Sequence, residues 1–335
     1  MFRRVFLILV VLAGSLYVSA QTKRFSFTRG KMGSPFTIIM YASDSAQATT
    51  IAEQSFQLVD SLVLIFSDYI DSSELNRLCA AAGPRNTPMV ISPALFEILA
   101  LSKYGYEKSN ETFDITLGPV TRLWRKARKE NVFPSKSVVQ GKLSLTGFQK
   151  LRLNKKNKTA HLLQKGMQLD LGGIAQGYIA QQVIDLIKRN NIKDALVDVS
   201  GDIIAIGAPT GKRGWTVGVN APGKGEELLK RTLLVSNKAV TTSGDLYQYM
   251  YHNGKKYSHI VDPKTGYGIT SQRNVTVIAS DGTTADWLTK ACSLLPISEA
   301  KKLATELNAA LLIIEIKDDK MMSYGTKSFE AYWKE

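Results

Sequence analysis

The spacing of apolar residues along the chain predicts both amphipathic helices and short strands. Apolar positions three and four residues apart predict helices after a cap at Asp44, after Ser92-Pro93, and over residues 173–189, 284–295 and 298–307. Short apolar runs predict strands over 36–41, 195–199, 203–206, 215–219, 232–235, 239–241, 249–251, 257–261, 275–279 and 310–316. Residues 134–165 are expected to form short strands and turns.

Turn signals indicate how these strands pair. Ser200-Gly201-Asp202 separates two of the predicted strands, and Asn253-Gly254, a favoured hairpin turn, separates two others. Because long helices interrupt strands that pair mostly antiparallel, the pattern predicts an α+β fold in one domain.

The N-terminus has the pattern of a secretory signal peptide. A basic start that ends at Arg4 precedes an apolar run over residues 5–12, and Val18-Ser19-Ala20 offers a cleavage site before Gln21. The apolar run is shorter than the roughly 20 residues that a membrane span needs. We therefore predict a signal peptide over 1–20, a mature domain over 21–335 and a periplasmic location, with an uncleaved anchor as the alternative.

The composition is basic, with 43 Lys and Arg against 29 Asp and Glu and a net charge of +14. Such a surface attracts anions, including nucleic acids, anionic lipids and phosphorylated ligands. The basic runs at 122–129 and 155–158 do not alternate with aromatic residues, as a platform for single-stranded nucleic acid would. For an exported protein we therefore exclude nucleic acid, and the charge is compatible with a dinucleotide ligand.

The two cysteines, Cys79 and Cys292, both lie in apolar helical surroundings. A chain of this length can bury a large core without covalent crosslinks. We expect buried free thiols, and a bridge between the two cysteines is the open alternative.

Three segments carry candidate chemistry. The first is residues 169–178, in which Asp170 is followed by Gly172-Gly173 and the start of a helix. The free N–H groups of such a helix start suit an anion. The alternative is an ordinary strand-to-helix turn. Gly177 lies in the first turns of that helix, where a glycine costs about 1 kcal/mol against alanine. This cost predicts that a neighbouring group packs tightly against Gly177.

The second segment combines residues 241–245 with residues 259–266. Three hydroxyl side chains and the carboxylate of Asp245 surround Gly244 at a strand end. Of the three histidines, His259 lies within an apolar strand close to Asp262, so it is either a core histidine or a base that a neighbour orients.

The third segment places Asp281 and Asp286 at the start of an apolar helix. Asp281 has the position of a helix cap, and the helix dipole favours Asp286 even without a ligand. A hard cation such as Mg²⁺ would need such a carboxylate together with further oxygen ligands.

Together and in this order, these segments resemble the FAD:protein FMN transferase family, also called the ApbE or thiamine-biosynthesis lipoprotein family. The resemblance extends over nearly the whole chain after the signal. Its pieces are residues 31–36, 66–76, 112–119, 123–124, 170–178, 198–202, 242–245, 259–266 and the helix that contains Asp286. It implies a single α+β domain, related to the T-fold, of mostly antiparallel sheet with packed helices.

The resemblance also implies a reaction. Members of the family split the pyrophosphate of FAD with the help of a divalent metal, transfer FMN to a Thr hydroxyl of an exported acceptor protein, and release AMP. FAD is therefore the expected substrate, Mg²⁺ or another divalent cation the expected cofactor, and a protein with a target Thr the expected partner. Membrane association is expected only through that acceptor or an uncleaved signal.

Carried over position by position, the resemblance implies three groups of site residues. The FAD site would be lined by Met32, Tyr69, Thr112, Phe113, Asp114, Asp170, Gln176 and Ile260. The metal site would consist of Gly173, Asp286 and Lys290. The catalytic group would be His259 as the base, with Asp262 and Asp245 orienting it or the substrate.

Two positions depart from the family pattern. Lys290 stands where the family has a metal-ligating Thr, and a protonated ammonium has no lone pair for a cation. Thr289 is an alternative ligand, and Ala175 is an alternative to Gly173 for the backbone oxygen. Gln176 stands where a Lys or Glu is common. The alternatives to a transferase are therefore an FAD pyrophosphatase or a non-catalytic FAD-binding relative with an altered metal site.

Overall fold

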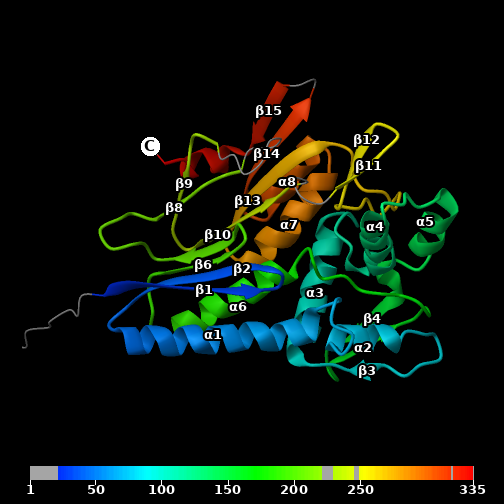
Figure 1. Cartoon of the computed structure of the whole chain (residues 1–335), viewed down its shortest axis with the longest axis horizontal. Coiled ribbons are helices and arrows are strands. Elements are labelled where there is room, and N and C mark those ends of the chain that lie inside the picture. The colour runs from blue at the N-terminus through cyan, green and yellow to red at the C-terminus, as the bar shows by residue number, and fades with distance from the viewer. Residues whose placement is uncertain (1–21, 221–228, 245–248, 318–319, 335) are drawn as a thin grey trace, which may run out of the picture.

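The computed structural model of the chain describes residues 22–220, 229–244, 249–317 and 320–334. The predicted signal peptide over 1–20 and the candidate residue Asp245 lie outside the described residues. A twisted sheet forms the centre of the described part, with helices packed along it and smaller sheets beside it (Figure 1).

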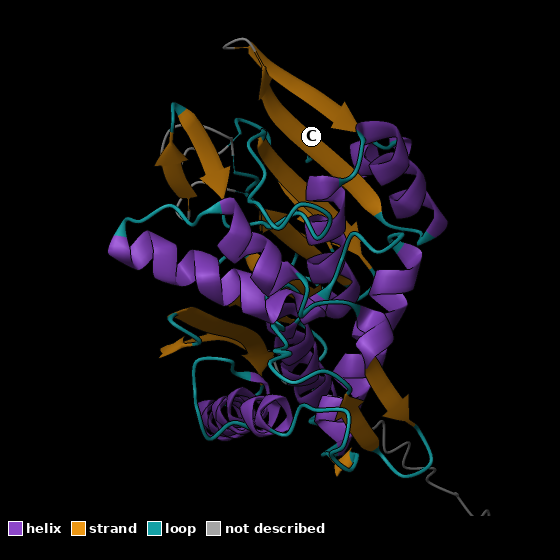
Figure 2. Ribbon diagram, turned by 90° about the vertical axis from the view of Figure 1, so that its right-hand side faces the viewer, coloured by secondary structure: helices purple, strands orange, loops and turns teal. Residues whose placement is uncertain are grey.

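The central sheet contains eight of the described strands, in the order β1-β2-β6-β7-β10-β13-β14-β15, and neighbouring strands run antiparallel. Their bounds are β1 (Lys23–Lys31), β2 (Ser34–Ala42), β6 (Ala195–Val199), β7 (Asp202–Ile206), β10 (Lys238–Ser243), β13 (Gln272–Ala279), β14 (Ala310–Lys317) and β15 (Lys320–Gly325). The paired strands β14 and β15 project from one end of the sheet (Figures 1 and 2). The predicted α+β architecture with a mostly antiparallel sheet is confirmed.

A layer of helices shares the main hydrophobic core with the sheet. It consists of α1 (Ser45–Phe66), α6 (Ala175–Arg189), α7 (Gly282–Leu294) and α8 (Ile297–Glu306). Successive strand residues point to opposite faces, so Val277 joins this core while Ile278 joins the core on the other face. Within the described residues, none of the helices combines the length and apolar character that crossing a membrane requires.

The opposite face of the sheet has its own cover. It consists of β8 (Trp215–Val217), β9 (Leu233–Val235) and the 3₁₀-helix η3 (Lys327–Tyr332). Trp215 is buried there and donates a hydrogen bond from Nε1 to the carbonyl of Ile206 at 3.0 Å. Because both faces are covered, the strands at the centre of the sheet are apolar on both sides.

Smaller elements pack beside one end of the helix layer (Figure 1). They are α2 (Glu74–Ala80), β3 (Met89–Val90), α3 (Pro93–Lys108), η1 (Ile115–Leu117), α4 (Gly118–Glu130), α5 (Lys136–Leu143), η2 (Phe148–Lys150), β4 (Leu151–Asn154), β5 (Thr159–Leu162), β11 (Tyr249–His252) and β12 (Lys255–Ser258). Trp124 of α4 stacks on Tyr257 of β12, and its Nε1 donates to the carbonyl of Gly266 at 2.8 Å. The indole thereby ties α4 to the loop over residues 259–266.

Most predicted elements are present, and one prediction is wrong. Residues 136–143 form helix α5 instead of a strand or turn. Val139 is buried on this helix, Leu143 is only partly buried and Val138 is exposed, so the helical period is weak in the sequence. Asp44 caps α1 as predicted, and both cysteines are buried and free.

Candidate functional site

Helix α6 follows the Gly172-Gly173 loop directly, and its first turn is capped from a distant part of the chain. The N-cap residue Ile174 offers no side-chain hydrogen bond. Instead, the backbone N–H of Gly177 donates to Oδ2 of Asp286 on α7 at 3.0 Å. The first N–H groups of a helix lack partners within the helix, and the positive end of its dipole favours a carboxylate. Asp286 therefore fixes α7 against the start of α6.

The contact between α6 and α7 depends on two glycines. A Cβ atom on Gly177 would lie 2.1 Å from the carbonyl oxygen of Gly282 and 2.7 Å from Cβ of Asp286. A Cβ atom on Gly282 would lie 2.6 Å from the carbonyl oxygen of Gly177. Both positions therefore exclude any larger residue, and the predicted close packing at Gly177 is observed.

Lys290 follows Asp286 by one helical turn, and its ammonium group forms an ion pair with the carboxylate. Nζ is 3.5 Å from Oδ1 of Asp286 and donates a hydrogen bond to Oγ of Ser243 at 2.9 Å. The side chain of Asp286 is 0 % exposed, whereas that of Lys290 is 22 % exposed. A ligand from solvent can therefore reach the lysine side chain but not the carboxylate behind it.

A second buried carboxylate, Asp202, belongs to the same cluster. Burial and the nearby charge of Asp286 raise the pKa of Asp202, while the Lys290 ammonium and the Thr241 hydroxyl lower it. Burial likewise raises the pKa of Asp286, while the ammonium of Lys290 and the N–H of Gly177 lower it in part. Lys290 thus supplies the positive charge that offsets both acidic groups.

Gly173 and Phe113 pack around the stem of this lysine. A Cβ atom on Gly173 would lie 3.0 Å from Cγ of Lys290 and 3.3 Å from the ring of Phe113. The Phe113 ring in turn packs on Trp287 of α7, with centroids 5.9 Å apart. Three predicted residues from different parts of the chain, Gly173, Phe113 and Lys290, therefore meet at one place.

Asp114 and Thr112 flank Phe113 at the start of η1. Oδ1 of Asp114 accepts hydrogen bonds from the backbone N–H and the hydroxyl of Thr116, both at 2.7 Å. Burial raises the pKa of Asp114, and the two bonds from Thr116 lower it. Thr112 is half-buried and donates its N–H to the carbonyl of Ser109 at 3.3 Å.

Arg125 of α4 connects two other predicted residues, Asp170 and Tyr69. Its guanidinium lies 4.4 Å above the Tyr69 ring, forms an ion pair with Asp68, and lies 3.8 Å from Oδ2 of Asp170. Asp170 also accepts from the Thr121 hydroxyl at 2.6 Å. The Tyr69 side chain is 77 % exposed, so an aromatic face lies open beside a cation.

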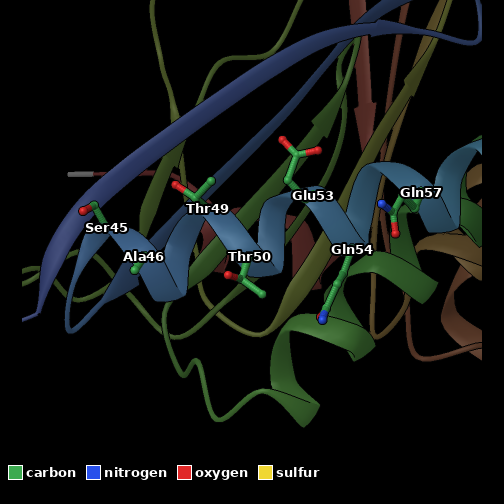
Figure 3. Close-up of a pocket in the computed structure, with 7 residues that line it drawn as sticks. All are labelled: Ser45, Ala46, Thr49, Thr50, Glu53, Gln54 and Gln57. Atoms are coloured by element: carbon green, nitrogen blue, oxygen red, sulfur yellow. The ribbon is translucent and has the colours of Figure 1, made fainter.

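Met32 lies in the tight turn between β1 and β2, with φ of 53° and Gly33 after it at 76°. Residues 28–35 line a surface hollow of about 520 Å³ at this turn. Another hollow, of about 530 Å³, lies over the first turns of α1 (Figure 3). It is lined from one helix face by Ser45, Ala46, Thr49, Thr50, Glu53, Gln54 and Gln57. None of the predicted site residues lines this second hollow. Glu53, which does line it, forms an exposed ion pair with Arg29, so we do not assign the site there.

The predicted catalytic group lies after β12. His259 and Ile260 are half-buried and buried, respectively, and the carbonyl of Ile260 accepts from the N–H of Ile269 at 2.9 Å. Both side-chain oxygens of Asp262 accept hydrogen bonds from its own turn, from Lys264 N at 2.8 Å and Thr265 Oγ1 at 3.2 Å. The structure thus gives Asp262 a part in the turn, while its action on His259, and that of Asp245, stay predictions.

The residues that were predicted to hold a divalent cation do not fit one as they are arranged. Mg²⁺ requires oxygen ligands at about 2.0–2.1 Å in octahedral geometry. Oδ1 of Asp286 is buried without a hydrogen-bond partner among the described residues, but the ammonium of Lys290 lies 3.5 Å from it and already supplies a positive charge there. Thr289 does not compensate, because it is fully buried and its hydroxyl donates to the Asp286 carbonyl at 2.7 Å. No group of three or more His, Cys, Asp or Glu side chains within the described ranges could hold a metal ion.

Sequence reasoning placed Gln176 correctly in the first turn of α6 and missed three residues of the site. They are Asp202, Ser243 and Arg125. Ser243 was among the hydroxyls of the 241–245 segment and Asp202 followed a turn, so both had a local signal. Their contact with Lys290 joins residues far apart in the sequence, which a local pattern does not reveal.

Comparisons with known proteins identify the family of the chain. The family model described as "ApbE family" matches residues 32–313. An FAD:protein FMN transferase of Klebsiella pneumoniae is 30% identical over 267 residues, covering 79% of this chain and 81% of the relative. One from Treponema pallidum is 30% identical over 311 residues, covering 88% and 84%. The flavinyl transferase ApbE of Pseudomonas stutzeri superposes with a TM-score of 0.83 at 25% identity, covering 93% and 97%. The chain belongs to the ApbE family.

Proposed function

We propose that the chain is an FAD:protein FMN transferase that acts outside the cytoplasm. In the proposed reaction, the hydroxyl oxygen of an acceptor Thr attacks the FMN-side phosphorus of FAD. A phosphoester bond forms, the pyrophosphate bond breaks, the hydroxyl proton goes to a base, and AMP leaves. The support comes from the family membership and from relatives that carry this activity in their names.

The observation that carries the proposal most directly is the position of Lys290 beside the Gly172-Gly173 loop. Attack on a pyrophosphate requires positive charge near the phosphoryl oxygens and a held, in-line geometry. The partly exposed side chain of Lys290 and the start of α6 supply that charge on one side. Because the metal does not fit the residues present, no step is assigned to it.

Two surfaces suit the remainder of FAD. The exposed ring of Tyr69, with Arg125 above it, offers a stacking face for a flat heterocycle. Met32 and Ile260 add apolar contacts, as the resemblance implies. His259 is the proposed base for the Thr proton, since an imidazole side chain can accept a proton at near-neutral pH.

The predicted signal peptide supports export, and the acceptor is then an exported or membrane-bound protein. N-terminal sequencing of the chain recovered from periplasmic extracts tests this point. A mature N-terminus at Gln21 supports it, and an unprocessed chain that stays in the cytoplasm contradicts it.

The activity test mixes the mature chain with FAD and an acceptor domain that carries a target Thr. AMP is measured by chromatography and labelled acceptor by in-gel flavin fluorescence. Equal amounts of AMP and labelled acceptor support the transferase. AMP without labelled acceptor supports an FAD pyrophosphatase instead. This activity is the second candidate because Lys290 stands where the family has a metal-ligating Thr.

A further inference from the structure

We propose that the ammonium group of Lys290 takes the place of the divalent cation in this chain, so that it binds the pyrophosphate of FAD without a metal. The proposal rests on the proposed function in one respect, namely that FAD is the ligand. Its other part, that the site at Asp286 does not take up a divalent cation, stands on the geometry alone.

The ammonium of Lys290 lies beside the carboxylate at which a metal would be expected. Nζ of Lys290 is within 3.5 Å of Oδ1 of Asp286, the one carboxylate that the resemblance assigns to the metal. The other oxygen, Oδ2, is engaged with the N–H of Gly177 at 3.0 Å. A cation that approached Oδ1 would therefore have to displace Lys290 or accept its charge as a close neighbour.

Contacts at both the ammonium and the stem hold Lys290 in this place. The Ser243 hydroxyl at the end of β10 accepts a hydrogen bond from Nζ at 2.9 Å. The lysine stem lies against Gly173, where a side chain would meet Cγ at 3.0 Å. The lysine stem thus packs against the residue whose backbone was predicted to offer an oxygen to the metal.

The chemistry of the ammonium group suits a phosphate ligand. An ammonium is a compact point charge with three donors, and the bond to Ser243 uses one of them while Asp286 lies at ion-pair distance. The side chain is 22 % exposed, so a donor can reach a phosphoryl oxygen from the solvent side. A lysine is a common ligand of phosphate groups in proteins.

The test measures two equilibria on the same mature protein. Manganese binding without FAD is followed by electron paramagnetic resonance, and FAD binding is followed by calorimetry with EDTA or with Mg²⁺. For the wild type we expect no manganese at this site and the same FAD affinity in both solutions. We expect Lys290→Thr to bind manganese, to lose FAD affinity roughly tenfold or more in EDTA, and to regain it with Mg²⁺.

Two variants serve as controls. Lys290→Met removes the charge without adding an oxygen ligand, so its FAD affinity should fall in both solutions. Lys103→Thr changes an exposed lysine of α3 and should leave both equilibria as in the wild type. Circular dichroism on each variant establishes that the fold is retained.

The outcomes separate this inference from the proposed function. Manganese binding by the wild type that Asp286→Asn abolishes would overturn the inference, as would FAD binding that requires Mg²⁺. If the wild type does not bind FAD at all, the proposed function fails. The manganese measurement on the wild type and Lys290→Thr then still decides whether the lysine replaces the cation.

Discussion

The backbone N–H of Gly177 donates a hydrogen bond to Oδ2 of Asp286, which lies 109 positions later in the chain. The two residues join the start of α6 to α7 beside the close approach of Gly177 and Gly282. The same carboxylate meets Lys290 through its other oxygen at 3.5 Å. One side chain thereby fixes both the helix start and the cation of the proposed FAD site.

The closeness of this approach predicts that Gly177→Ala destabilises the protein. The added methyl group would overlap the carbonyl of Gly282 at 2.1 Å, a backbone atom that cannot move aside alone. We expect a loss of about 2–3 kcal/mol in the free energy of unfolding, measured in urea. Gly141→Ala is the matched control, since that helical glycine has open space around its Cβ position and should gain about 0.5–1 kcal/mol. Equal effects of the two substitutions would contradict the packing described.

Asp114 predicts a pH dependence of stability. Burial raises its pKa in the folded protein above the ordinary value of about 3.9, so the folded state binds the proton more tightly than the unfolded state. Ionisation therefore costs stability as the pH rises from about 4 through the raised pKa. In Asp114→Asn this cost disappears, while the amide oxygen still accepts from Thr116. Urea unfolding from pH 4 to 8 should show the variant gaining over the wild type as the pH rises, and a constant difference would refute the assignment.

We predict that replacing Arg125 lowers the affinity for FAD without loss of the fold. Replacing it by Gln removes the cation over Tyr69 and its pairing with Asp68 and Asp170. Calorimetric titration with FAD should give an affinity roughly tenfold lower. Lys126→Gln, one residue along the same helix, removes an exposed cation paired only across a helical turn and should leave the affinity unchanged. A similar fall in both variants would mean that overall charge, not this contact, attracts FAD.

The thiols predict slow reaction with thiol reagents. Burial raises the pKa of Cys79 to about 11 and raises that of Cys292 as well, so neither side chain forms the reactive thiolate near neutral pH. An aromatic disulfide reagent should react slowly with the native protein. In denaturant without reductant it should count two thiols, since both cysteines are free. A count of zero in denaturant would reveal a disulfide bridge.

Much of the fold follows from local patterns in the sequence. The inner strands of the central sheet and helices α1, α6, α7 and α8 have strong apolar periods, and the caps of α1 at Asp44 and of α7 at Asp281 are formed as expected. Strand β1 was not predicted because it lies at the edge of the sheet, where most of its side chains are exposed. Strand β15, at the other edge of the sheet, was not predicted either, and its side chains are likewise mostly exposed.

The candidate site was predictable in its parts and not in its connections. Asp286, Lys290, Gly173 and Phe113 were each chosen from the sequence, and the structure brings them together. Neither the hydrogen bond from Lys290 to Ser243 nor the proximity of Asp202 follows from a local pattern, since both depend on how β7 and β10 pair beneath α7.

The intact mass of the acceptor domain tests the central claim most directly. The mature chain is incubated with FAD and the acceptor, and with an acceptor whose target Thr is changed to Ala. We predict a mass gain equal to FMN less one water on the Thr acceptor, matched by released AMP, and no gain on the Ala acceptor. An unchanged acceptor mass while FAD is bound or hydrolysed would contradict the transferase account.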